Sequence, residues 1–302
     1  MVVYWLFRLT ILLTRPLPLW LGYRVAAAVA EVCYHFFHRQ RKALNENLAW
    51  VLGSDDRREV DAVARRAFRN FGKFVIDFIH FPVMTRDEVR KRLVFTQWTD
   101  LDEVRDAGKG VIIVTMHFGI WDLGGAVLAA YDYPINAVAD SFGYEPMNEL
   151  VHGSREKLGI HVIPREKVGL NLFRALKRGE MVAMLIDVPG PQETITVEFL
   201  GAPAAVSSAP ARIALRTGAH VMPSVVLRGP ERDTLIRPIV DIRSVRYERT
   251  GDEERDVLAL TRQIMLVFEE HVRRHPEQWY IFRPMWPNAS DRAGQPAVAE
   301  AR

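Results

Sequence analysis

The 302-residue sequence has little cysteine and no long uncharged apolar run. Its one cysteine, Cys33, excludes an internal disulfide framework and any multi-cysteine zinc or iron–sulfur site. No window reaches the roughly 18 uncharged apolar residues of a confident transmembrane span. With 19 glycines and 17 prolines the chain is neither collagen-like nor of low complexity. The composition is that of a globular protein with a sizeable core.

Several catalytic motifs are also missing. The sequence contains no Gly-x-Ser-x-Gly nucleophile turn, no His-Glu-x-x-His zinc motif and no Gly-x-x-x-x-Gly-Lys phosphate loop. We therefore expect no metal and no resident cofactor. No zinc-finger or other nucleic-acid motif accompanies the arginines, so we expect no nucleic-acid partner.

Positive charge gathers at the N-terminus. Residues 1–45 hold six lysines and arginines against Glu31 alone, whereas the whole chain carries a net charge of +3. The same segment is rich in aromatic and aliphatic residues, interrupted by arginine and proline. This mixture suits the water–lipid boundary, so we expect residues 1–50 to form membrane-associating helices, peripheral or N-terminally anchored. Ordinary core helices with exposed arginines are the alternative, and a signal peptide is disfavoured by the prolines.

Apolar periodicity predicts an α/β fold. Residues 54–81 repeat apolar side chains every three or four positions, which indicates an amphipathic helix, and Thr85 to Glu88 forms a capping box for another. Later, short β-branched runs alternate with helical segments, which favours a largely parallel sheet flanked by helices. The predicted strands are 111–115, 135–139, 161–164, 181–186, 221–227 and 235–240. The predicted helices are 119–130, 147–158, 170–177, 209–216 and 252–275. We expect one domain over 51–287 and a disordered tail over 288–302.

The stretch from Thr115 to Gly125 is the most informative for function. His117 follows an apolar strand and Asp122 lies in the first turn of the next helix, which is where open α/β sheets carry their chemistry. A tight turn at Gly119 would bring the Asp122 carboxylate to one imidazole nitrogen, leaving the other to take a proton from a hydroxyl. The alternative is that Asp122 caps the helix beside an incidental histidine.

The residues around this stretch resemble the His-x-x-x-x-Asp block of membrane glycerolipid and glycolipid acyltransferases. The Phe-Gly-x-Trp interior is most similar to the bacterial lipid A biosynthesis acyltransferase family, which includes the phosphatidylinositol mannoside acyltransferases. Further similar blocks follow in the family's order over residues 1–287: 41–48, 155–159, 176–180, 184–187, 197–204, 214–219 and 275–279. The aspartate at 122 favours the phosphatidylinositol-mannoside-like branch.

The resemblance implies a glycerol-3-phosphate acyltransferase-like fold and an acyl transfer reaction. His117 is then the general base that deprotonates an acceptor hydroxyl, and Asp122 orients it. The hydroxyl attacks an acyl thioester carried by acyl carrier protein or coenzyme A. The acceptor is a phospholipid or glycolipid, similar to a phosphatidylinositol mannoside or a lipid A precursor. The resemblance also implies a site on the cytoplasmic face of the inner membrane, with membrane lipids as partners.

Four further site residues follow from the resemblance. Glu198 is similar to a family carboxylate that completes the relay, with a solvent-exposed strand residue as the alternative. Asp140 and Arg155 resemble a headgroup-binding acid and base, and Arg165 lies nearby in sequence. Arginine suits phosphate oxygens and carboxylate suits sugar hydroxyls, whereas the alternative is a surface ion pair.

The fatty chain requires a long apolar groove. Candidate linings are Phe71, Phe74, Phe78, Phe118 and Trp121, although aromatic residues at helical spacing also occur as plain core. We expect backbone amides after His117 to stabilise the thioester oxyanion. Two other functions stay open at this point: a lipid hydrolase that uses the same dyad to activate water, and a non-catalytic lipid-binding membrane protein.

Overall fold

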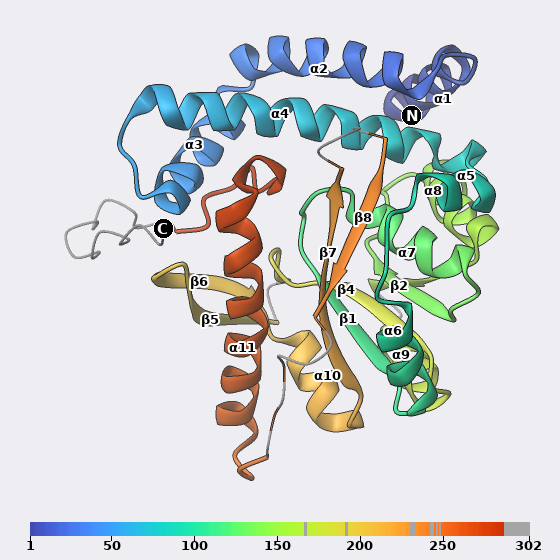
Figure 1. Ribbon diagram of the computed structural model, residues 1–302, viewed down its shortest axis with the longest axis vertical. Helices are drawn as coiled ribbons and strands as arrows, with labels where there is room; N and C mark the ends of the chain where they lie inside the picture. The colour runs from blue at the N-terminus through green and yellow to red at the C-terminus, as the bar shows by residue number, and fades with distance from the viewer. Residues whose placement is uncertain are drawn as a thin grey trace.

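A six-stranded sheet runs through the centre of the structure, which is a computed structural model that describes residues 1–165, 168–190, 193–229, 234–241, 245, 247 and 249–286 (Figure 1). The strand order is β3-β2-β4-β1-β7-β8, and only β8 pairs antiparallel. The largely parallel sheet is thus confirmed. The strands are β1 (Val111–Thr115), β2 (Ile135–Ala139), β3 (Ile160–Pro164), β4 (Met181–Leu185), β7 (His220–Arg228) and β8 (Ile236–Val240).

Helices cover both faces of this sheet. Side chains of β1 alternate between two core clusters, with Ile112 and Val114 on one face and Val111 and Ile113 on the other. The first face packs against α9 (Val168–Lys177), α10 (Ala209–Thr217) and α11 (Glu253–Arg274). The second packs against α5 (Arg86–Arg92), α6 (Trp98–Asp106), α7 (Trp121–Ala130) and α8 (Glu145–Leu158). The expected capping box at the start of α5 is present.

Four N-terminal helices lie across one end of the sheet (Figure 1). They are α1 (Val2–Thr14), α2 (Leu19–Phe36), α3 (His38–Leu52) and α4 (Arg57–His80). Helix α4 meets the carboxyl ends of the parallel strands, because Arg228 at the end of β7 donates to Asp77 of α4 at 2.7 Å. None of the described helices is both long enough and apolar enough to cross a membrane. Membrane association of residues 1–50 stays a prediction, as does the division at residue 50, and the expected tail lies outside the described residues.

A separate hairpin was not among the predicted strands. Strand β5 (Thr194–Phe199) pairs antiparallel with β6 (Ala202–Ser207), and together they pack beside α11. The sequence of β6 is rich in alanine and contains proline, so it lacks the β-branched pattern that revealed the other strands.

The C-terminal segment joins the turn that follows β1. The carbonyl of Gln278, the last residue of η3 (Pro276–Gln278), accepts from the Gly119 amide at 2.7 Å. Two residues further on, the Tyr280 amide donates to the His117 carbonyl at 2.9 Å. The buried Asn47 side chain of α3 donates to the Ile281 carbonyl at 3.0 Å. Residues from both ends of the chain therefore fix the backbone around His117.

The turn after β1 requires glycine at residue 119. Its φ is +62°, and a Cβ there would lie 2.0 Å from the Val226 carbonyl oxygen. The expected turn is present, but its backbone is held by β7 and by the C-terminal segment together.

We expect Gly119→Ala to lower the free energy of unfolding well beyond the roughly 1–3 kcal/mol of a strained backbone conformation. Gly53→Ala is the matched control, because Gly53 has a φ of +60° and no atom within 4 Å of an added Cβ. Urea denaturation measures both, and equal losses would contradict the close approach to Val226.

Candidate functional site

His117 is held by a buried aspartate at the carboxyl edge of the sheet. Its Nδ1 lies 2.9 Å from Oδ1 of Asp187, and its backbone amide donates to Oδ2 of the same carboxylate at 2.9 Å. Asp187 is fully buried, whereas the His117 side chain is 28% exposed. Within the described residues Nε2 of His117 has no hydrogen-bond partner. One imidazole nitrogen is therefore fixed and the other is available to a substrate.

The pairing of β1 with β4 brings these two residues together. The strands are parallel neighbours with Thr115 opposite Leu185, so the residues two positions further on, His117 and Asp187, lie level with each other. The Ile186 amide continues the ladder by donating to the Thr115 carbonyl at 3.0 Å. The register of the two strands alone therefore brings the His117 and Asp187 side chains together.

The electrostatics of this pair favour a charged imidazole. Burial favours the neutral ring, but the charge of Asp187 and its hydrogen bond outweigh burial, and Asp122 adds to them. The pKa of His117 is therefore raised above the ordinary value of 6.5, although the nearby Arg283 opposes the shift. An imidazole of this kind takes up a proton readily and is held in one orientation while it does so.

Asp122 does not accept the hydrogen bond that the sequence predicted for it. Its carboxylate pairs instead with Arg155 at 2.7 Å, and both side chains are largely buried, at 15% and 12% exposed. The Arg155 guanidinium also lies over the Phe78 ring, 5.9 Å from its centre. The prediction named the wrong partner for His117, because α7 directs Asp122 towards the last turn of α8. Asp122 still raises the pKa of His117 from its position beside the site.

Asp187 was not among the predicted site residues. It carried the same local signal as His117, since each is a polar residue two positions after the end of a buried strand. The missing information was the strand order, because β4 pairs with β1 although β2 and β3 come between them in the sequence.

Asp140 and Arg165 form an exposed ion pair at the same edge of the sheet. Their side chains meet at 3.1 Å, and Arg165 also lies 3.3 Å from Glu193. They follow the paired ends of β2 and β3, where Ala139 lies opposite Pro164. The carboxylates of Asp140 and Glu193 and the Arg165 guanidinium are all exposed to solvent, so these ion pairs contribute little to the stability of the fold.

The structure does not bring Glu198 to His117. This residue lies on β5, its side chain is 58% exposed, and it forms an ion pair with Arg262 of α11 at 3.2 Å. Its position is that of the alternative interpretation, in which Glu198 is a solvent-exposed residue of a strand. In the part of the chain that the structure describes, no group of three His, Cys, Asp or Glu side chains is placed to hold a metal ion.

Two of the backbone amides expected to stabilise an oxyanion already donate hydrogen bonds within the protein. Those of Gly119 and Ile120 donate to the carbonyls of Gln278 and Val226 at 2.7 and 2.8 Å. These two amides are therefore unavailable to a substrate. The first turn of α7 begins after them, and its positive end lies beside His117.

One apolar space begins beside the site, and a second lies among the N-terminal helices. A narrow cavity of about 50 Å³ extends from Trp121 beneath α7 and across the sheet to β8. A wider groove of about 590 Å³ lies between α1, α2 and α4, and Phe71 and Phe282 are in its lining. Phe74 stacks on Trp121 with ring centres 3.9 Å apart, and Trp121 lies 5.1 Å from the His117 ring. Of the predicted linings, Phe118 is instead fully buried in the core.

Comparison with known proteins gives consistent matches. The model of the bacterial lipid A biosynthesis acyltransferase family matches residues 1–288. The phosphatidylinositol mannoside acyltransferase of Mycobacterium tuberculosis (strain CDC 1551 / Oshkosh) is 25% identical over 260 residues, which cover 84% of this chain and 79% of that protein. The protein of the same name in Mycolicibacterium smegmatis is 23% identical over 248 residues, covering 80% of this chain and 78% of its own.

We expect NMR titration to give His117 a pKa above its ordinary value, and Asp187→Asn to lower it, because the neutral amide no longer stabilises the imidazolium. Spectra of His117→Ala identify the resonance. Asp140→Asn, which removes an exposed carboxylate at the same edge, is the control and leaves the pKa unchanged. An unshifted pKa in Asp187→Asn would show that the pair does not form in solution.

Proposed function

Because this chain belongs to the bacterial lipid A biosynthesis acyltransferase family and is an acyltransferase, we propose that it moves a fatty acyl chain from a thioester to a lipid hydroxyl at a membrane surface. The donor is an acyl group on acyl carrier protein or coenzyme A. The acceptor is a glycolipid or phospholipid similar to a phosphatidylinositol mannoside. The observation that carries the proposal is the His117 imidazole, which Asp187 holds through Nδ1 while the side chain stays 28% exposed.

The reaction needs only a base and a positioned pair of substrates. Nε2 of His117 accepts the proton of the acceptor hydroxyl as its oxygen attacks the thioester carbonyl. The tetrahedral intermediate then collapses, the carbon–sulfur bond breaks, and the imidazolium returns its proton to the leaving thiolate. Asp187 stabilises the imidazolium throughout, and the positive end of α7 favours the charge that develops on the carbonyl oxygen. The products are an ester and a free thiol.

The polar pairs around His117 suit a headgroup acceptor. Arg155 is held by Asp122, whose charge acts on His117, and a guanidinium binds two phosphate oxygens at once. Asp140 and Arg165 lie further out along the edge, where a carboxylate is able to accept hydrogen bonds from sugar hydroxyls. We assign these two pairs to the acceptor headgroup.

The two apolar spaces suit two lipid chains. The narrow cavity begins beside the base at Trp121, which favours it for the acyl chain under transfer. A chain longer than the cavity has to displace the side chains that line it. The wide groove has no charged side chain in its lining and opens between the N-terminal helices, which favours it for the tails of the acceptor.

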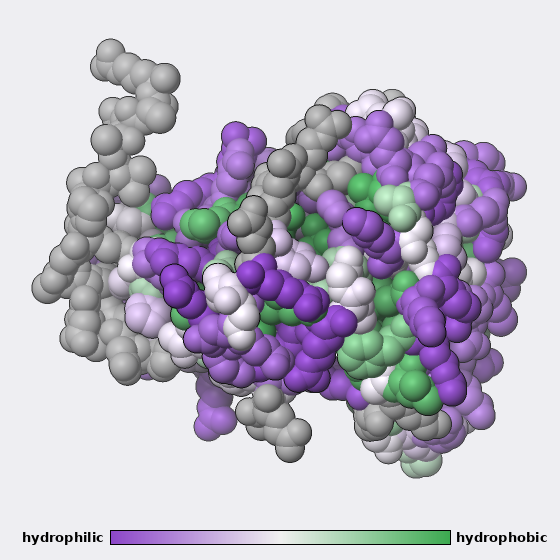
Figure 2. All heavy atoms as spheres, turned by 90° about the horizontal axis from the view of Figure 1, so that it is seen from below, coloured by the Kyte–Doolittle hydropathy of each residue, from purple (hydrophilic) through white to green (hydrophobic). Residues whose placement is uncertain are grey.

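The distribution of exposed apolar side chains supports a membrane location. Of 22 large hydrophobic residues exposed in the described structure, 14 belong to residues 1–37. On α1 they include Trp5, Leu9 and Leu12, which recur along one helix face. Figure 2 views the molecule from the side opposite α1 and α2, where hydrophilic side chains predominate. We propose that α1 and α2 lie in the interface on the cytoplasmic face of the inner membrane, with the protein peripheral to the bilayer.

Mass spectrometry of a native lipid extract tests the reaction. We expect the wild type, supplied with palmitoyl-coenzyme A or palmitoyl-acyl carrier protein, to form a new acylated lipid. His117→Ala should slow its formation by about 10²–10⁴-fold, because the proton then has no base. His161→Ala, which removes an exposed histidine on β3, is the control with unchanged rate. Free fatty acid as the main product would instead identify a hydrolase, and no product with either donor would favour the non-catalytic lipid-binding protein.

Vesicle sedimentation tests the membrane location. We expect the triple variant Trp5→Gln, Leu9→Gln, Leu12→Gln to bind vesicles about 100-fold less well, since each of these half-exposed side chains contributes roughly 1 kcal/mol on burial. Leu170→Gln, Leu258→Gln, Leu266→Gln removes exposed apolar side chains from α9 and α11 and is the control. Similar binding by both triple variants would rule out α1 as the contact.

A further inference from the structure

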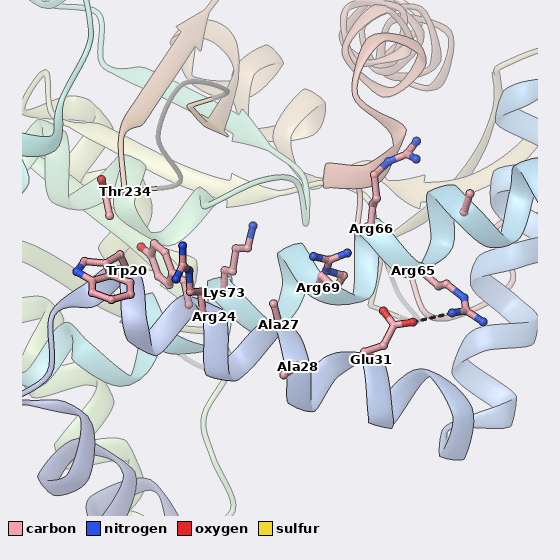
Figure 3. Close-up of a pocket in the computed structure, with 12 residues that line it drawn as sticks. Trp20, Arg24, Ala27, Ala28, Glu31, Arg65, Arg66, Arg69, Lys73 and Thr234 are labelled. Atoms are coloured by element: carbon pink, nitrogen blue, oxygen red, sulfur yellow. Dashed lines mark hydrogen bonds and ion pairs between the residues drawn. The ribbon is translucent and has the colours of Figure 1, made fainter.

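A third recess, the basic cleft, lies between α2 and α4 (Figure 3). It is on the other side of α2 from the wide apolar groove. Its volume is about 970 Å³. Five cationic side chains and one carboxylate line it: Arg24 and Glu31 from α2, and Arg65, Arg66, Arg69 and Lys73 from α4. None of these charged side chains has a part in the reaction described above.

The charges in the basic cleft are only partly neutralised. Glu31 pairs with Arg65 at 2.7 Å, and this ion pair is the dashed contact in Figure 3. Arg24 lies over the Trp20 ring, 5.0 Å from its centre. Among the described residues Arg66 and Arg69 have no carboxylate partner. Like charges three and four residues apart destabilise a helix, so the row on α4 has a cost that an anionic ligand would offset.

The basic cleft is preformed because α2 is locked onto α4. The Tyr23 hydroxyl donates to the buried Asp77 carboxylate at 2.5 Å, and the helices approach so closely that a Cβ on Gly72 would lie 2.9 Å from the Ala26 carbonyl oxygen. In Figure 3 the side chains of Arg24, Arg69 and Lys73 extend to the same side of this helix pair. A rigid wall that aims several cations at one volume is suited to phosphate oxygens.

The surroundings of the basic cleft indicate the source of the phosphate. The helix that supplies Arg24 also exposes Val25, Val29 and Val32, each more than half accessible to solvent. Trp20, 52% exposed, closes one end of the cleft, and an indole below a guanidinium is typical of the headgroup level of a bilayer. An acidic helix of a protein partner would match the row of cations on α4 but would leave these apolar neighbours in water.

We propose that the basic cleft binds the phosphate-bearing headgroup of an anionic membrane phospholipid, distinct from the acceptor bound at His117. The proposal rests on the membrane location proposed above. A headgroup held in the cleft fixes the rotation of α2 in the interface, so that the apolar groove on its other side faces the lipid from which the acceptor comes.

Sedimentation with two kinds of vesicle tests this proposal with the full-length protein. The vesicles are phosphatidylcholine alone, and phosphatidylcholine with phosphatidylglycerol as the minor component. Arg66→Gln/Arg69→Gln should bind the anionic vesicles about 25-fold less well than wild type, from roughly five-fold per cationic side chain at an anionic surface. Binding to phosphatidylcholine alone should not change. Arg216→Gln/Arg274→Gln removes two exposed arginines elsewhere and is the control.

Equal losses of binding to anionic vesicles in both double variants would show that only the overall surface charge matters, and would overturn the proposal. Failure of the wild type to bind either vesicle would instead overturn the membrane location on which the proposal rests. Acyl transfer in neutral detergent should stay at the wild-type rate in Arg66→Gln/Arg69→Gln, which checks that the variant is folded.

Calorimetry with soluble probes distinguishes the sources of phosphate. We expect short-chain phosphatidylglycerol to bind the wild type and not Arg66→Gln/Arg69→Gln. Inorganic phosphate that binds as tightly would assign the cleft to a free anion and overturn the lipid. Acyl carrier protein that binds the wild type and not the variant, with vesicle binding unchanged, would assign the cleft to a protein partner.

Discussion

The hydrogen-bonded pairing of β1 with β4 is the constraint on which the site depends. Because Thr115 lies opposite Leu185, the next two residues of each strand place His117 beside Asp187 without further adjustment. The carboxylate is fully buried and is bound on both oxygens, by the imidazole and by the His117 amide. A buried charge is tolerated only where such partners are present, so the chemistry and the local stability share the same contacts.

The N-terminal helices are fastened to this edge by a second buried charge. Burial alone would raise the pKa of Asp77, but the guanidinium groups of Arg228 and Arg92 hold it below its ordinary value. The carboxylate also accepts from Tyr23, so one side chain of α4 joins α2, α5 and β7. Breaking a buried pair of this kind typically costs about 3–5 kcal/mol. Helix α2, which is proposed to meet the membrane, is thus fastened over the strand ends.

Local patterns in the sequence predicted all six strands of the main sheet and the position of His117. Strands β1 and β2 match their predicted ranges: β1 is a continuous β-branched run, and β2 is a short, mostly apolar run between two helical segments. Asp187 could not be assigned to His117 in this way, because the sequence of residues 181–187 does not indicate that β4 lies next to β1 in the sheet. Asp122 was assigned instead from a turn at Gly119 and from the resemblance to the His-x-x-x-x-Asp block, and in the structure its carboxylate pairs with Arg155. Glu198 was predicted as a site residue from the family resemblance alone, and it lies on a hairpin outside the main sheet.

The pH dependence of acyl transfer in two carboxylate variants tests most directly whether Asp187 is the partner of the base. The wild-type rate should fall as pH decreases through the raised pKa of His117, because the protonated imidazole cannot accept the hydroxyl proton. In Asp187→Asn this fall should move to lower pH and the maximal rate should drop by several orders of magnitude, while Asp122→Asn should move it less. A larger displacement in Asp122→Asn than in Asp187→Asn would contradict the account.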